Sequence, residues 1–113
     1  MQSYEPSRSD WKLFKEKIAG WQETYMACLL KEYARLIHVG RSAADRFWEL
    51  EQKIKEDKRK KGVQLELNKS LMVYDIVALI NEGAIVMEDL RDFSDELRSK
   101  VGSVLDNQTL FDK

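Results

Sequence analysis

A long apolar stripe near the start of the chain constrains the fold more than any other feature. The spacing of its members, three or four residues, places them on one face of a helix of about seven turns, which we predict over residues 10–38. Burial of this face is expected to dominate the free energy of folding, because it carries several large aromatic rings. The members of the stripe are Trp11, Phe14, Ile18, Trp21, Tyr25, Cys28, Leu29, Tyr33, Leu36 and Ile37.

Ser9 or Asp10 is expected to cap this first helix, and Gly40 to end it. Gly20 falls inside the helix, where glycine costs about 1 kcal/mol relative to alanine. We therefore expect a close helix crossing or a local bend at Gly20. His38 lies in the last turn, where a cation suits the helix dipole.

A second helix is predicted to begin at Ser42 and to end at Gly62, after a connection too short for any arrangement but an antiparallel hairpin. Its inward stripe is expected to contain Ala44, Phe47 and Ile54, with Leu50 or Glu51 between them.

Two shorter helices are predicted at about 69–82 and 87–105, the first capped by Asn68 or Ser70 and ended by Gly83. Residues 63–67 alternate apolar and polar side chains, which predicts an extended linker, or a strand if a second chain supplies a partner. The apolar residues expected to face inward from the last helix are Leu90, Phe93, Leu97, Val101 and Val104.

At 113 residues the chain is long enough for one domain with its own core. We predict an all-α, four-helix domain, in which a shorter helical hairpin packs on the long one. Residues 1–8 are expected to form a flexible arm, 9–105 the helical domain, and 106–113 a polar C-terminal tail. A net charge of −1, one cysteine and no long apolar run favour a cytoplasmic protein that neither crosses nor binds a membrane.

No pattern of residues indicates catalysis or a cofactor. Cys28 and His38 lie ten residues apart on one helix, about 15 Å along its axis, so they cannot form a catalytic pair within one molecule. We interpret Cys28 as a small core residue and His38 as a surface or helix-end cation. The sequence therefore predicts a protein that is not an enzyme and holds no cofactor.

Acidic residues gather in the second half, where seven acids and two arginines lie between residues 75 and 98. They do not alternate around a glycine as calcium ligands do, so we expect no metal site. They favour a solvated acidic face, which could bind a partner by imitating phosphate. The candidate contacts are Glu88, Asp89, Asp92, Asp95 and Glu96.

A basic stretch spans residues 53–61 and is the best candidate for contact with nucleic acid. Six cations stand there against two acids, and phosphate contacts require such clustering. Lysines are also common at a solvated helix end, which is the alternative interpretation. The candidate residues are Lys53, Lys55, Lys58, Arg59, Lys60 and Lys61.

Trp48 follows Phe47 directly, so the two side chains point about 100° apart on a helix. We expect Trp48 to cover the third or fourth helix. The alternative is an exposed tryptophan at a partner surface, because tryptophan is a frequent anchor of protein interfaces.

The segment LINEGAIVMEDLRDFSDELRSKV, residues 79–101, resembles the short helical hairpin modules called SHOCT domains. Gly83, Ile85, Leu90 and Phe93 carry the resemblance, while Met87 stands where the family usually has threonine. The resemblance implies an association module. The chain as a whole is similar to short helical proteins of bacterial and phage genomes, some of which inhibit host defence nucleases.

Taken together, these patterns predict a non-enzymatic helical protein, an adaptor or inhibitor, that binds another protein. A homodimer is expected as well, because the first helix carries more apolar surface than the second can cover. One alternative is a nucleic-acid-binding regulator that uses residues 53–61. The other is a phage-type, anti-CRISPR-like inhibitor of a defence nuclease that uses the acidic C-terminal half.

Overall fold

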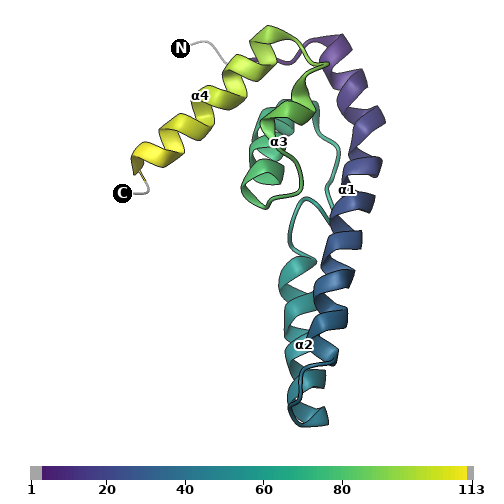
Figure 1. The fold of residues 1–113 in the computed structure, drawn as a ribbon. Helices are drawn as coiled ribbons and strands as arrows, with labels where there is room; N and C mark the ends of the chain where they lie inside the picture. Colours follow the sequence, from purple (N-terminus) through teal and green to yellow (C-terminus); the bar gives the residue numbers. More distant parts are fainter. Residues whose placement is uncertain (1–3, 112–113) are drawn as a thin grey trace.

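The computed structural model describes residues 4–111 and confirms an all-α fold with four α-helices and no strand among them (Figure 1). Two short 3-10 helices precede the third and fourth α-helices. The elements are α1 (Arg8–Ile37), α2 (Ala43–Asp57), η1 (Lys69–Leu71), α3 (Met72–Asn81), η2 (Met87–Leu90) and α4 (Asp95–Phe111).

Helix α1 runs the length of the molecule (Figure 1). Its N-cap is Ser7, whose hydroxyl accepts a hydrogen bond from the backbone N–H of Asp10 at 3.1 Å, so the predicted caps at Ser9 or Asp10 were wrong by two or three residues. Asp10 is instead a buried acid in the first turn. Gly20 has no neighbour within 4 Å of an added Cβ, so it marks no close helix crossing.

Helix α2 returns antiparallel beside the C-terminal half of α1, as predicted, and Ser42 caps it. The register is fixed at the tip by the Arg46 guanidinium, which donates to the Ile37 carbonyl oxygen at 2.6 Å. Further along, the Lys53 ammonium lies 3.8 Å from a Glu32 carboxylate oxygen.

The second helix ends five residues before its predicted stop at Gly62. Beyond Asp57 the backbone N–H groups of Lys61 and Gly62 donate to the Glu82 carboxylate, both at 3.0 Å. These two donors are therefore unavailable to continue α2. Residues 64–68 follow as an irregular segment without strand pairing.

The head of the molecule consists of α3, α4 and the N-terminal half of α1 (Figure 1). Its core combines side chains of all three helices and the turns between them. The buried set is Phe14, Ile18, Met72, Val73, Ile76, Val77, Leu79, Ile85, Leu90, Phe93, Leu97 and Val101.

The fourth predicted helix is divided. Residues 87–90 form η2, and α4 begins only after Ser94, whose hydroxyl accepts from the backbone N–H of Leu97 at 3.2 Å. The break lets Phe93 enter the core between the two elements. Of the five residues predicted to face inward from this last helix, only Val104 is not fully buried. Residues 106–111, predicted to be a polar tail, continue α4, while 112–113 lie outside the described residues.

Gly83 ends α3 in the left-handed conformation, with φ of 82°, as its predicted role as a helix stop requires. At the other end of the chain, Pro6 is buried and Tyr4 packs against the head. The described part of the predicted arm therefore lies on the core. Among the described residues, no helix is both long enough and apolar enough to span a membrane.

Candidate interaction surface

The most conspicuous surface is apolar and lies on the projecting part of the α1–α2 hairpin. Below the head the hairpin consists of these two helices alone (Figure 1). We name its exposed apolar residues the hairpin face. They are Leu30 (64% exposed), Ile37 (41%), Phe47 (63%), Trp48 (64%) and Ile54 (38%).

The antiparallel register places four of these residues, Leu30, Ile37, Phe47 and Ile54, on one side of the hairpin. Leu30 and Ile54 line the same groove, so they lie at one level. Ile37 stands seven residues after Leu30, and Phe47 stands seven residues before Ile54. Seven residues are close to two helical turns, so each pair keeps to one helix side. Trp48 extends this face through an edge-to-face contact with Phe47, at 5.0 Å between ring centroids.

The predicted inward stripe of α2 was therefore wrong, because Ala44, Phe47 and Ile54 are all exposed. The expectation that Trp48 covers the third or fourth helix was also wrong, and its alternative, an exposed tryptophan, is what the structure has. The side of α2 that meets α1 carries polar residues instead. Arg46, Leu50 and Lys53 are half-buried there, and Asp57 is buried.

The groove beside Leu30 and Ile54 has a volume of about 190 Å³ and is almost wholly apolar. Its lining residues are Met26, Leu29, Leu30, Tyr33, Ile54, Asp57, Lys58 and Val63. Such a shape accepts an apolar side chain or the edge of a helix, rather than a charged metabolite.

A polar contact between α1 and α2 lies at the edge of the groove. The Tyr33 hydroxyl donates to Asp57 Oδ2 at 2.5 Å, and the Lys60 ammonium lies 3.2 Å from Oδ1. Burial by itself would raise the pKa of the Asp57 carboxyl, but the hydrogen bond from Tyr33 and the ammonium groups of Lys60 and Lys53 lower it below its ordinary value. Burial and the same carboxylate raise the pKa of the Tyr33 hydroxyl.

The basic stretch predicted for nucleic acid is divided by the fold. Half of its cations lie beside carboxylates of the protein: Lys53 beside Glu32, Lys60 beside Asp57 and Lys61 beside Asp75. Lys55, Lys58 and Arg59 remain exposed. These three residues are all that the stretch offers to a phosphate backbone without breaking an internal ion pair.

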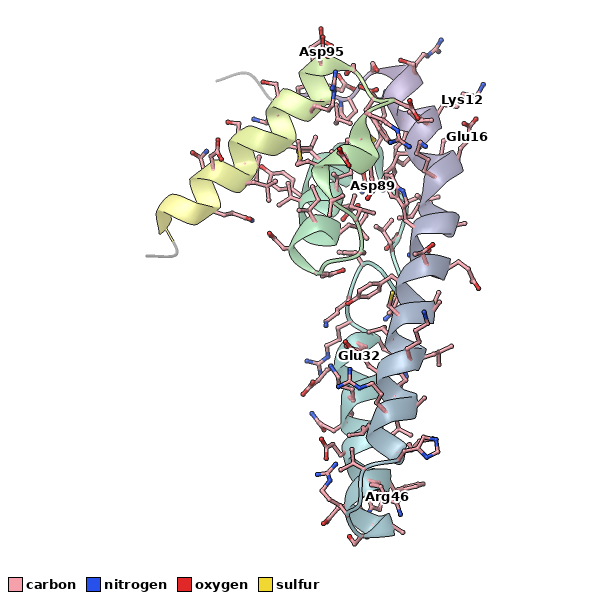
Figure 2. All side chains as sticks on the ribbon, in the orientation of Figure 1. Lys12, Glu16, Glu32, Arg46, Asp89 and Asp95 are labelled. Atoms are coloured by element: carbon pink, nitrogen blue, oxygen red, sulfur yellow. The ribbon has the colours of Figure 1, made fainter. Side chains whose placement is uncertain are left out.

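The acidic set is divided in the same way. Asp89 accepts the backbone N–H of Val86 at 2.8 Å, Asp92 lies 3.5 Å from the Lys17 ammonium, and Asp95 pairs with Arg98. Glu88 and Glu96 are exposed and form no ion pair within residues 4–111. Figure 2 shows Asp89 and Asp95 on the head, remote from Glu32 and Arg46 on the hairpin.

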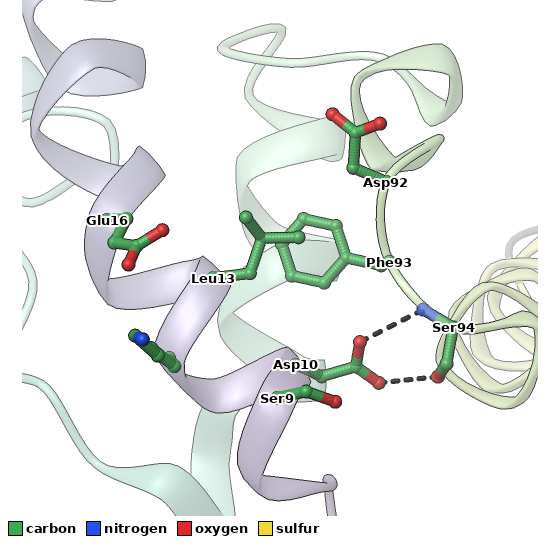
Figure 3. Close-up of a pocket in the computed structure, with 8 residues that line it drawn as sticks. Ser9, Asp10, Leu13, Glu16, Asp92, Phe93 and Ser94 are labelled. Atoms are coloured by element: carbon green, nitrogen blue, oxygen red, sulfur yellow. Dashed lines mark hydrogen bonds between the residues drawn. The ribbon is translucent and has the colours of Figure 1, made fainter.

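A shallow pocket lies where the starts of α1 and α4 meet (Figure 3). The buried Asp10 carboxylate accepts from the backbone N–H of Ser94 at 2.9 Å and from its hydroxyl at 2.5 Å. Asp10 thus joins the first turns of two helices, where a negative charge is stabilised by both dipoles. Because both carboxylate oxygens of Asp10 accept hydrogen bonds within the protein, we interpret this contact as one that holds α1 and α4 together rather than as a binding site.

Cys28 and His38 are both exposed, so the expectation that Cys28 is a core residue was wrong. Its neighbour Leu29 occupies the buried side of α1 instead. Across residues 4–111, no three residues of the types that bind metals come together as a potential site.

No protein-family model, no curated protein and no solved structure matches this chain.

Four residues of the hairpin face were not predicted to be exposed: Leu30, Ile37, Phe47 and Ile54. Leu30 lies outside the predicted stripe although it is as apolar as the stripe members around it. An apolar side chain on the wrong side of a strongly periodic helix is the signal that identifies such a residue.

Proposed function

We propose that this protein is a non-enzymatic adaptor or inhibitor that binds another protein through the hairpin face. The observation that carries the proposal is the exposure of five large apolar side chains on a two-helix projection. Soluble proteins rarely leave such residues together without a use for them, and exposed aromatic residues such as the Phe47–Trp48 pair are typical of an interface.

The composition of the face supports a helical or otherwise apolar partner surface. Leu30 and Ile54 border a groove, and Trp48 stands beyond it with almost two thirds of its surface exposed. A partner helix can place apolar residues at intervals of three and four into this groove and cover the Trp48 ring. The rim of the face is polar, as the rim of an interface normally is.

A photocrosslinking experiment tests the proposal in cells that express the protein. A photoreactive phenylalanine analogue replaces Trp48, and in a matched control it replaces Tyr74, which is 62% exposed on the head. We expect protein adducts from position 48 and few from position 74, since only the first position lies on the hairpin face.

The adducts also separate the rival functions. An adduct that nuclease digestion removes would support a regulator bound to nucleic acid through Lys55, Lys58 and Arg59. Protein adducts that form at Glu88 and Glu96 but not at position 48 would support an inhibitor that uses the acidic half. Either result, or equal yields at positions 48 and 74, would contradict the proposal.

A further inference from the structure

We infer that the hairpin face binds a second copy of this chain, with the two α2 helices packed antiparallel across a twofold axis. This inference rests on the proposed function, because it names the partner of the same surface. Its basis is the distribution of charge along α2, which is complementary to that of a second α2 helix in the antiparallel orientation.

The net exposed charge changes sign along α2. The exposed charged residues of the first half are Asp45, Glu49 and Glu51, and those of the second half and the turn after it are Lys55, Glu56, Lys58 and Arg59, so the first half is net negative and the second net positive. An antiparallel copy of the same helix places the acidic half of each α2 against the basic half of the other. A parallel copy would place like charges together, which is unfavourable.

One register satisfies both the charges and the aromatic residue. When the twofold axis passes at the level of Lys53, Glu51 lies opposite Lys55 of the second copy. Trp48 then lies opposite Lys58, whose ammonium can cover the indole ring. Each contact occurs twice, because a twofold axis repeats it.

The residues used in this register are available in the single chain. Glu51, Lys55 and Lys58 line one shallow depression around Ile54. None of the three charged side chains forms an ion pair within residues 4–111, although Glu51 and Lys55 are spaced i and i+4. Their partners are therefore free to come from outside the chain.

The apolar residues fit the same arrangement. Leu30 lies at the level of Ile54, so both fall next to the proposed axis and meet their own copies. Two hairpins packed in this way form four antiparallel helices around a closed apolar centre, which is a stable helical architecture. The hairpins project away from the heads, so the two heads lie at opposite ends (Figure 1).

Sedimentation velocity of the purified full chain at high micromolar concentration tests the inference. We expect a dimer for the unchanged protein. Trp48→Glu and Leu30→Glu should each weaken self-association by at least about 100-fold, the loss typical of a central interface residue. Tyr74→Glu, a control of similar exposure on the head, should leave the dimer intact. Circular dichroism shows whether each variant keeps its helices.

Charge reversal tests the antiparallel register. Glu51→Lys and Lys55→Glu should each weaken the dimer by about tenfold, because each replaces two attractions by two repulsions. An equimolar mixture of the two variants should associate as tightly as the unchanged protein, since opposite charges then face each other across the axis. A mixture that associates no better than its components would overturn the register.

A monomer at every concentration would overturn the inference, as would a dimer that Trp48→Glu does not weaken. Failure of the proposed function has a different signature. A monomeric protein whose position 48 crosslinks to a different protein retains the proposed function and loses only the self-association. A monomeric protein with no protein adduct at position 48 loses both.

Discussion

Gly62 lies so close to the ring of Tyr25 that a Cβ added to it would stand 2.3 Å from the ring carbon Cδ2. The glycine is buried, and the ring of Tyr25 is buried as well. This contact joins the turn after α2 to the middle of α1, at the level where the projecting hairpin meets the head.

Gly62→Ala is expected to destabilise the protein by about 1–3 kcal/mol, because the Tyr25 ring must move in a packed site to admit one methyl group. Urea denaturation measures the change in the free energy of unfolding. Gly20→Ala is the matched control. No atom lies within 4 Å of its added Cβ inside α1, so it should stabilise the protein by about 0.5–1 kcal/mol. Equal effects of the two substitutions would contradict the role given to Gly62.

The sequence predicted the apolar side of the N-terminal half of α1 and of the head well, because the periodicity there is satisfied within one molecule. Phe14, Ile18 and Leu97 are buried as their spacing requires. The same reasoning failed for α2. Its apolar side, with Phe47 and Ile54, faces outward. The side of α2 that packs on α1 carries polar residues, and their hydrogen-bond partners are on α1, as the Tyr33 hydroxyl is for Asp57.

The candidate charged sites could be identified from the sequence only as clusters. The pairing of Lys61 with Asp75, fourteen residues away, depends on how α3 packs, and the same is true of the two N–H groups that Glu82 accepts. Periodicity within one helix carries no information about such contacts between elements. The apolar surface was detectable in principle, because Trp48 interrupts a largely polar side of α2 and Leu30 lies outside the predicted stripe of α1.

Tyr33→Phe is expected to cost about 1–3 kcal/mol at neutral pH, because it leaves a buried carboxylate oxygen of Asp57 without its donor. The loss should depend on pH. The lowered pKa of Asp57 stabilises the folded state above about pH 4, the ordinary range of an aspartate, and this contribution disappears as the pH falls through the lowered pKa.

Urea denaturation of the unchanged protein and of Tyr33→Phe between neutral and strongly acidic pH measures this dependence. The two stabilities should converge in acid, since a protonated Asp57 is neutral and no longer needs two donors. A constant difference across this pH range would show that the hydroxyl contributes by packing alone.

Asp75→Asn is expected to raise the stability at neutral pH. Burial raises the pKa of the Asp75 carboxyl, and the Lys61 ammonium at 3.8 Å opposes this only in part. One carboxylate oxygen of Asp75 has no hydrogen-bond partner among the described residues. A raised pKa favours folding below about pH 4, and that advantage is lost as the pH rises through the folded-state value.

The asparagine removes the buried charge and keeps the shape, so the gain should be present at pH 7 and absent in acid. Thermal denaturation at the two pH values measures it. Asp57→Asn is the control. Because the pKa of Asp57 is lowered rather than raised, this substitution should lower the stability at pH 7. A loss of stability for Asp75→Asn at pH 7 would mean that its pairing with Lys61 outweighs the cost of burial.

Glu82→Ala is expected to loosen the junction between the hairpin and the head. The Glu82 carboxylate accepts the backbone N–H groups of Lys61 and Gly62 from twenty or more residues away, both at 3.0 Å. Without it the two donors lose their partner in a partly buried site, which costs about 1–3 kcal/mol. Amide hydrogen exchange should therefore accelerate at residues 61 and 62 before it changes in α3.

Glu88→Ala, at an exposed acid on the same head, should leave both amides unaffected. Unchanged protection of both amides in Glu82→Ala would show that the contact of Gly62 with Tyr25 holds this turn without the carboxylate.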